Sequence, residues 1–263
     1  MTTLNPHPPF VAGNWKMHLT VEEASRLAAQ TAKGALETPG AELVLIPPFT
    51  SLQGVRRALA DTPVQLGAQN MHWEDKGAFT GEVSPPMLID AGCRYVVLGH
   101  SERRQLFGET DAGVNRKIMA ALRVGLTPIF CLGETLAERE AGRTMDRAGS
   151  QLGAGLEGLD AGSISSLVMA YEPVWAIGTG KTATPAQAQE VHAFLRRSLT
   201  ETYGNEAASC VIILYGGSVK PDNAFSLFRE KDIDGFLVGG ASLEASSFLQ
   251  ITKEALRAHK EKT

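Results

Sequence analysis

Short apolar runs alternate with longer amphipathic segments along the chain from Phe10 onward. An apolar run of this length is typical of a strand that is covered on both faces, as in a parallel sheet. Eight runs are predicted to be strands: Phe10–Gly13, Leu43–Ile46, Val64–Ala68, Tyr95–Leu98, Pro128–Cys131, Leu167–Tyr171, Val211–Leu214 and Gly235–Val238. Helices are predicted between and after them at Val21–Lys33, Ser51–Ala60, Pro85–Ala91, Asp111–Val124, Met145–Leu156, Pro185–Tyr203, Asp222–Phe228 and Leu243–His259.

This alternation predicts an α/β fold, a closed (β/α)₈ barrel of eight parallel strands surrounded by helices. An open doubly wound sheet is the alternative, but it would need fewer strands or a second domain. Helix start signals support the assignment. Thr20 and Glu23 form a capping-box pattern before the first helix, and Thr184 followed by Pro185 is a typical N-cap pair.

The composition is that of a single globular domain. The chain has 263 residues, 43% of them hydrophobic, and no linker divides it. We therefore expect one barrel domain over residues 10–263, after a flexible N-terminal extension at 1–9. The net charge of −4 argues against nucleic acid or an anionic membrane surface as a partner.

Cysteine usage and the N-terminus indicate a reducing compartment. The three cysteines are widely spaced and include no CxxC pair, so neither a disulfide framework nor a zinc site is indicated. Met1–Pro9 lacks the basic start and apolar run of a signal peptide, and no apolar run is long enough to span a bilayer. These features predict a cytoplasmic protein.

The stretch 170–181 begins as a strand and continues as a loop. Pro173 supplies no N–H, so the strand cannot continue past Glu172. An apolar segment and then Gly178-Thr179-Gly180 follow, which is typical of a lid that closes over a site. The alternative is a surface loop whose Trp175 packs on the core. Gly180-Lys181-Thr182 is not a P-loop, because the first glycine of that motif would fall at Trp175. Gly178-x-Gly180-x-x-Ala183 also fits the loose dinucleotide fingerprint, but five residues separate Glu172 from Gly178 and no strand follows within the expected βαβ distance.

Reactive side chains lie at the predicted carboxyl ends of three strands. Asn14 and Lys16 follow the first strand, His100 and Glu102 the fourth, and Glu172 the sixth. In a closed barrel these ends meet at one mouth, where active sites are built. We therefore expect the side chains to converge there.

Glycine pairs follow the seventh and eighth strands. Gly239 and Gly240 precede a predicted helix, Gly216-Gly217 precedes Ser218, and Gly178 could approach from the lid. Exposed backbone N–H groups at a helix start can bind an anion without a charged side chain. These residues predict a phosphate site, although glycines that serve tight turns only are the alternative.

A carboxylate, a histidine and a lysine beside a phosphate suit proton abstraction next to a carbonyl. Glu172 would act as the base, with its pKa raised when the lid closes. Lys16 would offset the charge of the phosphate and of an enediolate. His100 would be a neutral hydrogen-bond donor, because it lies at a predicted helix N-terminus that disfavours imidazolium. The other five histidines are interpreted as surface or structural. Ser101 is not interpreted as a nucleophile, because the closing glycine of a nucleophile elbow is absent.

With these residues identified, the chain resembles the triosephosphate isomerase family from about Phe10 to its end. The matching blocks are Gly13–Met17, Gly67–Asn70, Gly77–Glu82, Val97–Arg104, Ala170–Lys181, Tyr215–Ser218 and Gly235–Ser242. The resemblance implies interconversion of dihydroxyacetone phosphate and D-glyceraldehyde 3-phosphate through an enediolate, in glycolysis and gluconeogenesis, with no metal or other cofactor.

The resemblance also implies a role for each matching residue. Glu172 is expected to be the base, His100 the neutral electrophile and Lys16 the electrostatic anchor, with Asn14 and Glu102 as supporting catalytic residues. The pairing of a glutamate base with a neutral histidine is already well known for this family. The residues expected to bind substrate are Asn14, Lys16, Gly178, Ser218, Gly239 and Gly240.

A homodimer is expected as well. The long loop Gln69–Gly81 carries Trp73 and Phe79, which would form an apolar patch in water. The resemblance implies that this loop docks into a partner subunit, with Thr80 reaching the neighbouring site. A loop folded onto its own barrel is the alternative. Two other functions stay open: a catalytically silent phosphate-binding or scaffold barrel, and another phosphosugar isomerase or epimerase.

Overall fold

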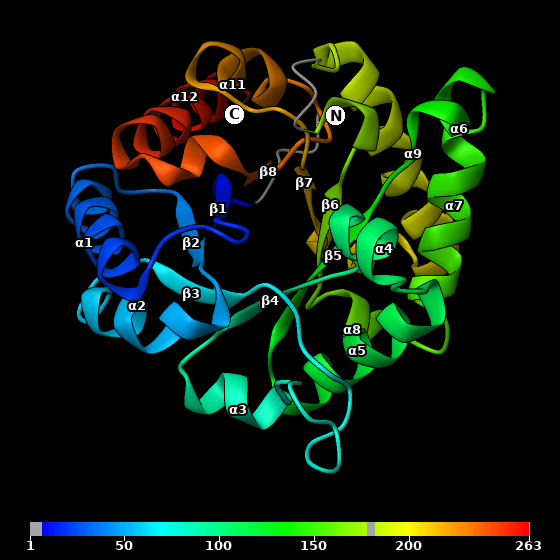
Figure 1. Ribbon diagram of the computed structural model, residues 1–263. Helices are drawn as coiled ribbons and strands as arrows, with labels where there is room; N and C mark the ends of the chain where they lie inside the picture. Colours follow the sequence, from blue (N-terminus) through cyan, green and yellow to red (C-terminus); the bar gives the residue numbers. More distant parts are fainter. Residues whose placement is uncertain (1–6, 178–181, 263) are drawn as a thin grey trace.

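Eight parallel strands close into a barrel in sequence order, with β1 paired to both β2 and β8 (Figure 1). The computed structural model describes residues 7–177 and 182–262. The strands are β1 Phe10–Asn14, β2 Glu42–Ile46, β3 Gln65–Ala68, β4 Tyr95–Leu98, β5 Thr127–Leu132, β6 Val168–Tyr171, β7 Ile212–Tyr215 and β8 Gly235–Val238. The predicted closed barrel is confirmed, and the open doubly wound sheet is wrong.

Helices surround the barrel on its outside (Figure 1). They are α1 Val21–Leu36, α2 Leu52–Ala58, α3 Pro85–Asp90, α4 Ser101–Phe107, α5 Asp111–Val124, α6 Leu136–Glu140, α7 Thr144–Gly155, α8 Ala161–Ile164, α9 Pro185–Tyr203, α10 Asn205–Cys210, α11 Pro221–Phe228 and α12 Ala245–Lys262. Three short 3₁₀ turns are also present within the described residues: η1 Phe49–Ser51, η2 Val174–Ala176 and η3 Gly240–Leu243. All eight predicted helices are confirmed. The sequence pattern missed α6, α8 and α10, because helices this short show no full period of apolar positions.

The strands are apolar apart from polar residues at some of their ends, such as Asn14 and Glu42, because they separate two cores. Val97 and Ile129 point into the barrel, whereas Val96, Leu98 and Phe130 point outward to the helices. Both faces of each strand are therefore covered, which is the condition under which a parallel sheet is stable. Closing the barrel also removes every exposed sheet edge.

The predicted helix starts are confirmed by their hydrogen bonds. At α1, the Glu23 carboxylate accepts a hydrogen bond from the backbone N–H of Thr20 at 2.8 Å. At α9, the Thr184 hydroxyl accepts from the N–H of Gln187 at 3.2 Å, and the Gln187 side chain accepts from the N–H of Thr184 at 3.0 Å. None of the helices in the described chain is long and apolar enough to cross a membrane.

Candidate active site

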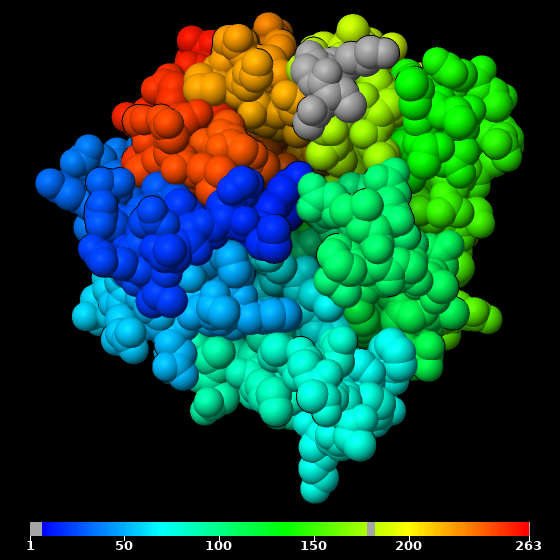
Figure 2. Space-filling view, in the orientation of Figure 1, coloured from blue at the N-terminus to red at the C-terminus, as the bar shows by residue number. Residues whose placement is uncertain are grey.

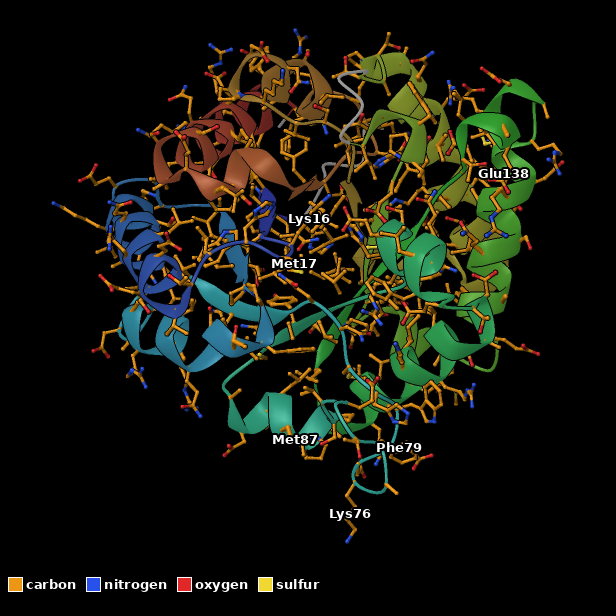
Figure 3. The ribbon with its side chains drawn as sticks, in the orientation of Figure 1. Lys16, Met17, Lys76, Phe79, Met87 and Glu138 are labelled. Atoms are coloured by element: carbon orange, nitrogen blue, oxygen red, sulfur yellow. The ribbon has the colours of Figure 1, made fainter. Side chains whose placement is uncertain are left out.

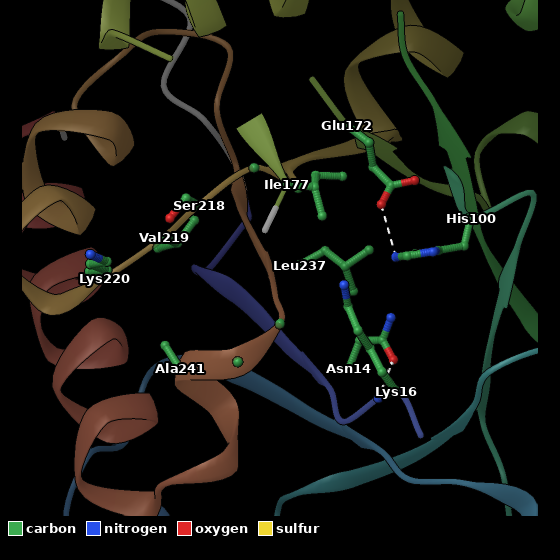
Figure 4. Close-up of a pocket in the computed structure, with 14 residues that line it drawn as sticks. Asn14, Lys16, His100, Glu172, Ile177, Ser218, Val219, Lys220, Leu237 and Ala241 are labelled. Atoms are coloured by element: carbon green, nitrogen blue, oxygen red, sulfur yellow. Dashed lines mark hydrogen bonds and ion pairs between the residues drawn. The ribbon is translucent and has the colours of Figure 1, made fainter. Parts of the chain in front are cut away.

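A pocket of about 280 Å³ opens at the carboxyl ends of the strands (Figure 4). Its volume is close to that of small-ligand sites. The pocket brings together predicted site residues from the ends of β1, β4, β6 and β8 and from the loop after β7. The residues that line it include Asn14, Lys16, His100, Glu172, Ser218, Gly239 and Gly240. Gly178 lies outside the described residues.

Glu172 and His100 form a buried pair at one end of this pocket. Nε2 of His100 lies 3.0 Å from Oε1 of Glu172, and the side chains are 8% and 2% exposed. Oε2 of Glu172 also accepts a hydrogen bond from the backbone N–H of Ser101 at 2.9 Å. Because that N–H belongs to the first residue of α4, the helix N-terminus stabilises the carboxylate.

The pKa of each partner reflects this pairing. Burial opposes ionisation of Glu172, but His100, the Ser101 N–H and Lys16 together lower the pKa of its carboxyl. Burial also opposes charge on His100, yet the carboxylates of Glu172 and Glu102 raise the pKa of the ring. Both directions are opposite to those expected from the sequence. The physical reason is that the two groups face each other directly, with Nε2 and Oε1 3.0 Å apart.

A backbone hydrogen bond determines which nitrogen of His100 carries the proton. Nδ1 accepts a hydrogen bond from the N–H of Glu102 at 3.3 Å, so this nitrogen needs its lone pair. A proton on Nδ1 would face that N–H and the positive end of α4. Oε2 of Glu102 lies 3.7 Å from Nδ1, which is too far for a hydrogen bond, so a second proton on the ring would have the Glu102 N–H as its nearest backbone neighbour and no acceptor within hydrogen-bond distance. The ring is therefore assigned as neutral, with Nε2–H donating to Glu172.

Lys16 projects into the pocket from a strained backbone. Its φ of 51° lies in the left-handed region, which costs a non-glycine residue roughly 1–3 kcal/mol. Two side chains hold this conformation: Oδ1 of Asn14 accepts from the Lys16 N–H at 3.0 Å, and Nε2 of Gln69 donates to the Lys16 carbonyl at 2.7 Å. Nζ of Lys16 is paired with Glu102 at 2.5 Å. Strain that is held in place at a pocket indicates a functional position.

The predicted phosphate residues lie at the other end of the pocket. Gly239 follows β8 and Gly240 begins η3, whose first N–H groups have no acceptor within the turn. Nζ of Lys16 would lie 3.9 Å from a Cβ placed on Gly239, so a cation stands beside this backbone. Ser218 contributes to the same wall. The arrangement can bind an anion by backbone dipoles and one ammonium.

The residues predicted to form the dimer loop lie in different surroundings. Gln69 lies beside the pocket through its bond to Lys16. Phe79 and Thr80 are exposed on a loop that projects from the barrel, with Lys76 labelled beyond Phe79 (Figures 2 and 3). Trp73 is half-buried, with the Arg116 guanidinium 3.9 Å from its ring centroid. Thr80 therefore has no place in the pocket of its own chain.

Two buried polar residues behind the pocket were missed by the sequence reasoning. Glu134 is fully buried after β5, where it accepts from the Trp175 indole at 2.8 Å and the Tyr171 hydroxyl at 3.0 Å. Glu134 could have been found from the sequence, because it follows the predicted fifth strand in the same way that Glu172 follows the sixth. Gln151 accepts from the N–H of Gly133 at 2.8 Å. It lies within a helix, so its role had no local signal. No group of three or more side chains able to hold a metal occurs among the described residues.

Comparison with known proteins gives one consistent match. A family model described as "Triosephosphate isomerase" matches residues 9–255. A triosephosphate isomerase from Moorella thermoacetica is 58% identical over 243 residues, which cover 92% of this chain and 97% of that protein. Those of Chloroflexus aurantiacus and Geobacter metallireducens are 56% and 55% identical, over 92% and 91% of this chain and 97% and 96% of their own lengths.

Proposed function

The chain belongs to the triosephosphate isomerase family and is an aldose–ketose isomerase of that family, and on this premise we propose that it interconverts dihydroxyacetone phosphate and D-glyceraldehyde 3-phosphate through an enediolate. The observation that carries the proposal is the buried Glu172–His100 pair, which lines one pocket together with Lys16, Ser218, Gly239 and Gly240. This reaction belongs to glycolysis and gluconeogenesis. The cytoplasmic location stays a prediction from the sequence.

Glu172 is the proposed base. It removes a proton from C1 of dihydroxyacetone phosphate and returns it to C2. Substrate must first separate Glu172 from His100, because one Nε2–H cannot donate both to the carboxylate and to the substrate carbonyl. Once Glu172 loses the bond to His100, its burial dominates and raises its pKa, which makes it a stronger base. The raised pKa expected from the sequence thus belongs to the substrate complex.

His100 is the proposed electrophile. Its Nε2–H donates to the carbonyl oxygen and then to the enediolate oxygen, while the Glu102 N–H holds the Nδ1 lone pair. With Glu172 withdrawn, burial and the start of α4 keep the ring neutral. A hydrogen bond aimed at developing negative charge in a buried site is worth about 3–4 kcal/mol of barrier.

Lys16 and the backbone after β7 and β8 are proposed to hold the phosphate. Lys16 neutralises charge on the phosphate and the enediolate, and Glu102 and Asn14 keep it in place. Ser218, Gly239 and Gly240 contribute dipoles at the far end of the pocket. Gly178 and the lid of 173–181 stay predictions. Binding one end of the substrate fixes its reactive carbons against Glu172 and His100.

A homodimer is proposed from the exposed apolar side chains near the mouth. Met17 is 93% exposed, and Phe79, Met87 and Phe107 are 43%, 55% and 69% exposed. Figure 3 labels Met17 beside Lys16, Phe79 on the projecting loop and Met87 on α3, the helix that follows this loop. Such a set of exposed apolar side chains is typical of an interface. Docking would bring Thr80 to the site of the neighbouring subunit, as the resemblance implies.

The test is a coupled assay for triose phosphate isomerisation with purified protein, beside Glu172→Ala. We expect rapid turnover in the wild type and a loss of about 10³-fold or more in the variant, because a positioned base contributes about 10²–10⁴-fold. Circular dichroism and sedimentation control for folding and dimers. A folded wild-type dimer without activity would overturn the proposal and favour a silent barrel. Turnover of pentose phosphates but not trioses would favour another phosphosugar isomerase.

A further inference from the structure

Two arginines of α5 contact the base of the loop Gln69–Gly81. The guanidinium of Arg116 lies over the Trp73 ring, 3.9 Å from its centroid. Two turns further along the same helix, the guanidinium of Arg123 donates to both carboxylate oxygens of Asp75, at 2.8 and 2.9 Å. Residues seven apart lie on one side of a helix, so both arginines face the loop. We name these two contacts the arginine clamp.

A row of stacked rings continues from the clamp toward the tip of the loop. The Trp73 and His72 rings are stacked with their centroids 4.2 Å apart, and the Phe79 ring lies 4.3 Å from that of His72 at an interplanar angle of 32°. His72 is itself buried, and its N–H donates to the Val83 carbonyl at 2.8 Å, which closes the base of the loop. Phe79 at the tip is therefore connected to α5 through two further rings.

A glycine lets the tip fold back onto this row. Gly77 has a φ of 145°, and a Cβ placed on it would lie 2.8 Å from the Phe79 ring. The chain bends so closely here that a residue without a side chain is needed to leave room for Phe79. The tip of the loop, where Lys76 and Thr80 are exposed, thus has a defined shape within a single subunit.

A defined shape matters for a loop that projects from its barrel (Figures 1 and 3). A loop without such support samples many conformations, and ordering it on association lowers the affinity. The apparent dissociation constant rises as the fraction of subunits with a correctly shaped loop falls. A twofold dimer uses one loop from each subunit, so this fraction enters the dissociation constant as its square.

We propose that Arg116 and Arg123 hold the loop Gln69–Gly81 in the shape that docks into a second copy of the chain. The inference rests on the homodimer proposed above. Both arginines are positioning residues, because they lie on α5 outside the loop and act through Trp73 and Asp75. Their contacts are made within one subunit, so the loop is already shaped before a partner binds.

The test is the dimer dissociation constant of the clamp variant Arg116→Gln/Arg123→Gln. Fluorescence-detected sedimentation over a dilution series measures it for the wild type and the variant. We expect the dissociation constant to rise about tenfold, because a threefold fall in the fraction of correctly shaped loops is squared. An unchanged dissociation constant in the clamp variant would overturn the proposal.

The matched control is Arg197→Gln/Arg257→Gln. These two exposed arginines lie over the rings of Phe194 and Phe225, on α9 and α12, which Figure 1 shows away from the loop. The control removes the same net charge and the same type of ring contact. We expect its dissociation constant to stay within twofold of the wild type. A rise equal to that of the clamp variant would overturn the proposal, because net charge would then explain both.

A second measurement follows the loop itself. Lys76 is exposed near the tip, where endoproteinase Lys-C can cleave after it. At a protein concentration below both dissociation constants, we expect cleavage after Lys76 to be at least threefold faster in the clamp variant than in the wild type, because cleavage follows the population of the opened loop. Mass spectrometry of the fragments gives the rates. Equal rates would overturn the proposal.

The dilution series also separates this inference from the homodimer on which it rests. A wild type that stays monomeric at every concentration would overturn both. A wild-type dimer with the same dissociation constant as the clamp variant would overturn the inference alone and leave the homodimer in place.

Discussion

Two buried histidines of this barrel differ in what their neighbours offer. His100 lies at the start of α4 with Nε2 3.0 Å from a carboxylate, and the Glu172 and Glu102 charges raise its pKa against the effect of burial. His192 lies within α9, and burial lowers its pKa to about 3. Its ring packs edge-on against Tyr171, with the centroids 5.8 Å apart. Burial is therefore common to both, and the adjacent carboxylates account for the difference.

The two rings are also expected to be opposite tautomers. Nδ1 of His192 lies 3.1 Å from the Asp232 carbonyl, which can only accept, so Nδ1 carries the proton. Nδ1 of His100 faces a backbone N–H, which can only donate, so Nε2 carries the proton. One backbone group thus directs the proton of His100 into the pocket, and another directs that of His192 into the protein. The comparison explains why a buried histidine is a candidate electrophile in one place and structural in the other.

The largest expected effect is the fall in kcat for His100→Gln, and His192→Gln is the matched variant at the other ring. We expect kcat to fall about 10²–10³-fold for His100→Gln, because a donor to the developing oxyanion is lost. His192→Gln should keep kcat within threefold. The coupled assay on both purified variants, with circular dichroism as a folding control, makes the measurement. Equal losses would show that His100 acts through the fold rather than the reaction.

The second effect is on stability and depends on pH. The pKa of His192 is lower in the folded state than the unfolded value of 6.5, so the unfolded chain binds the extra proton between pH 6.5 and about 3. The associated stability is complete above pH 6.5 and declines as the pH falls toward 3, by up to about 1.4 kcal/mol per pH unit.

We expect His192→Gln to be less stable than the wild type at pH 7 by about 1–3 kcal/mol, through the lost bond to Asp232. The difference in the free energy of unfolding between wild type and variant should narrow by about 2 kcal/mol at pH 5. The wild type loses stability there because its unfolded chain takes up a proton on His192, and the variant has no such group. Urea unfolding at the two pH values measures it. A difference that does not change with pH would mean that His192 is already charged in the folded protein.

The third prediction removes the carboxylate that distinguishes the two rings. In Glu172→Gln, His100 keeps its burial and its place on α4 but loses the largest favourable charge. The pKa of His100 should then move below its ordinary value, as that of His192 does. An NMR titration of the ring resonances follows it, with Glu206→Gln as a control at an exposed carboxylate on α10. A pKa that stays raised would mean that Glu102 alone controls the ring.

The smallest effect is measured on the wild-type protein and tests the tautomer of each of the two rings. At pH 7 we expect ¹⁵N chemical shifts of the neutral Nε2–H tautomer for His100 and of the Nδ1–H tautomer for His192. The assignments can be made by comparison with His100→Gln and His192→Gln. Imidazolium shifts for His100 would show that the pull of Glu172 exceeds the constraint from the Glu102 N–H.

Much of the fold and the position of the site could be predicted from the sequence. The apolar runs placed every strand to within about a residue, because strand burial on both faces leaves a local pattern. Pro173 fixed Glu172 at the end of β6, and the apolar run before Gly99 placed His100 after β4. The two glycine pairs after β7 and β8 were placed correctly in the wall of the pocket. Each of these signals lies within a few residues of the position it identifies.

What only the tertiary structure decided are the contacts between distant strand ends. The pairing of Glu172 with the start of α4 joins residues 71 apart, and a second, smaller pocket lined by Glu172 joins α4, α7 and the loop after β5. Nothing local distinguishes Gln151 from any other helical glutamine, or shows that Gln69 holds Lys16 in a left-handed conformation. Spacing along the chain determines which residues reach the mouth of the barrel. Closure of the barrel determines which of them touch, and therefore their charge, their tautomer and their access to water.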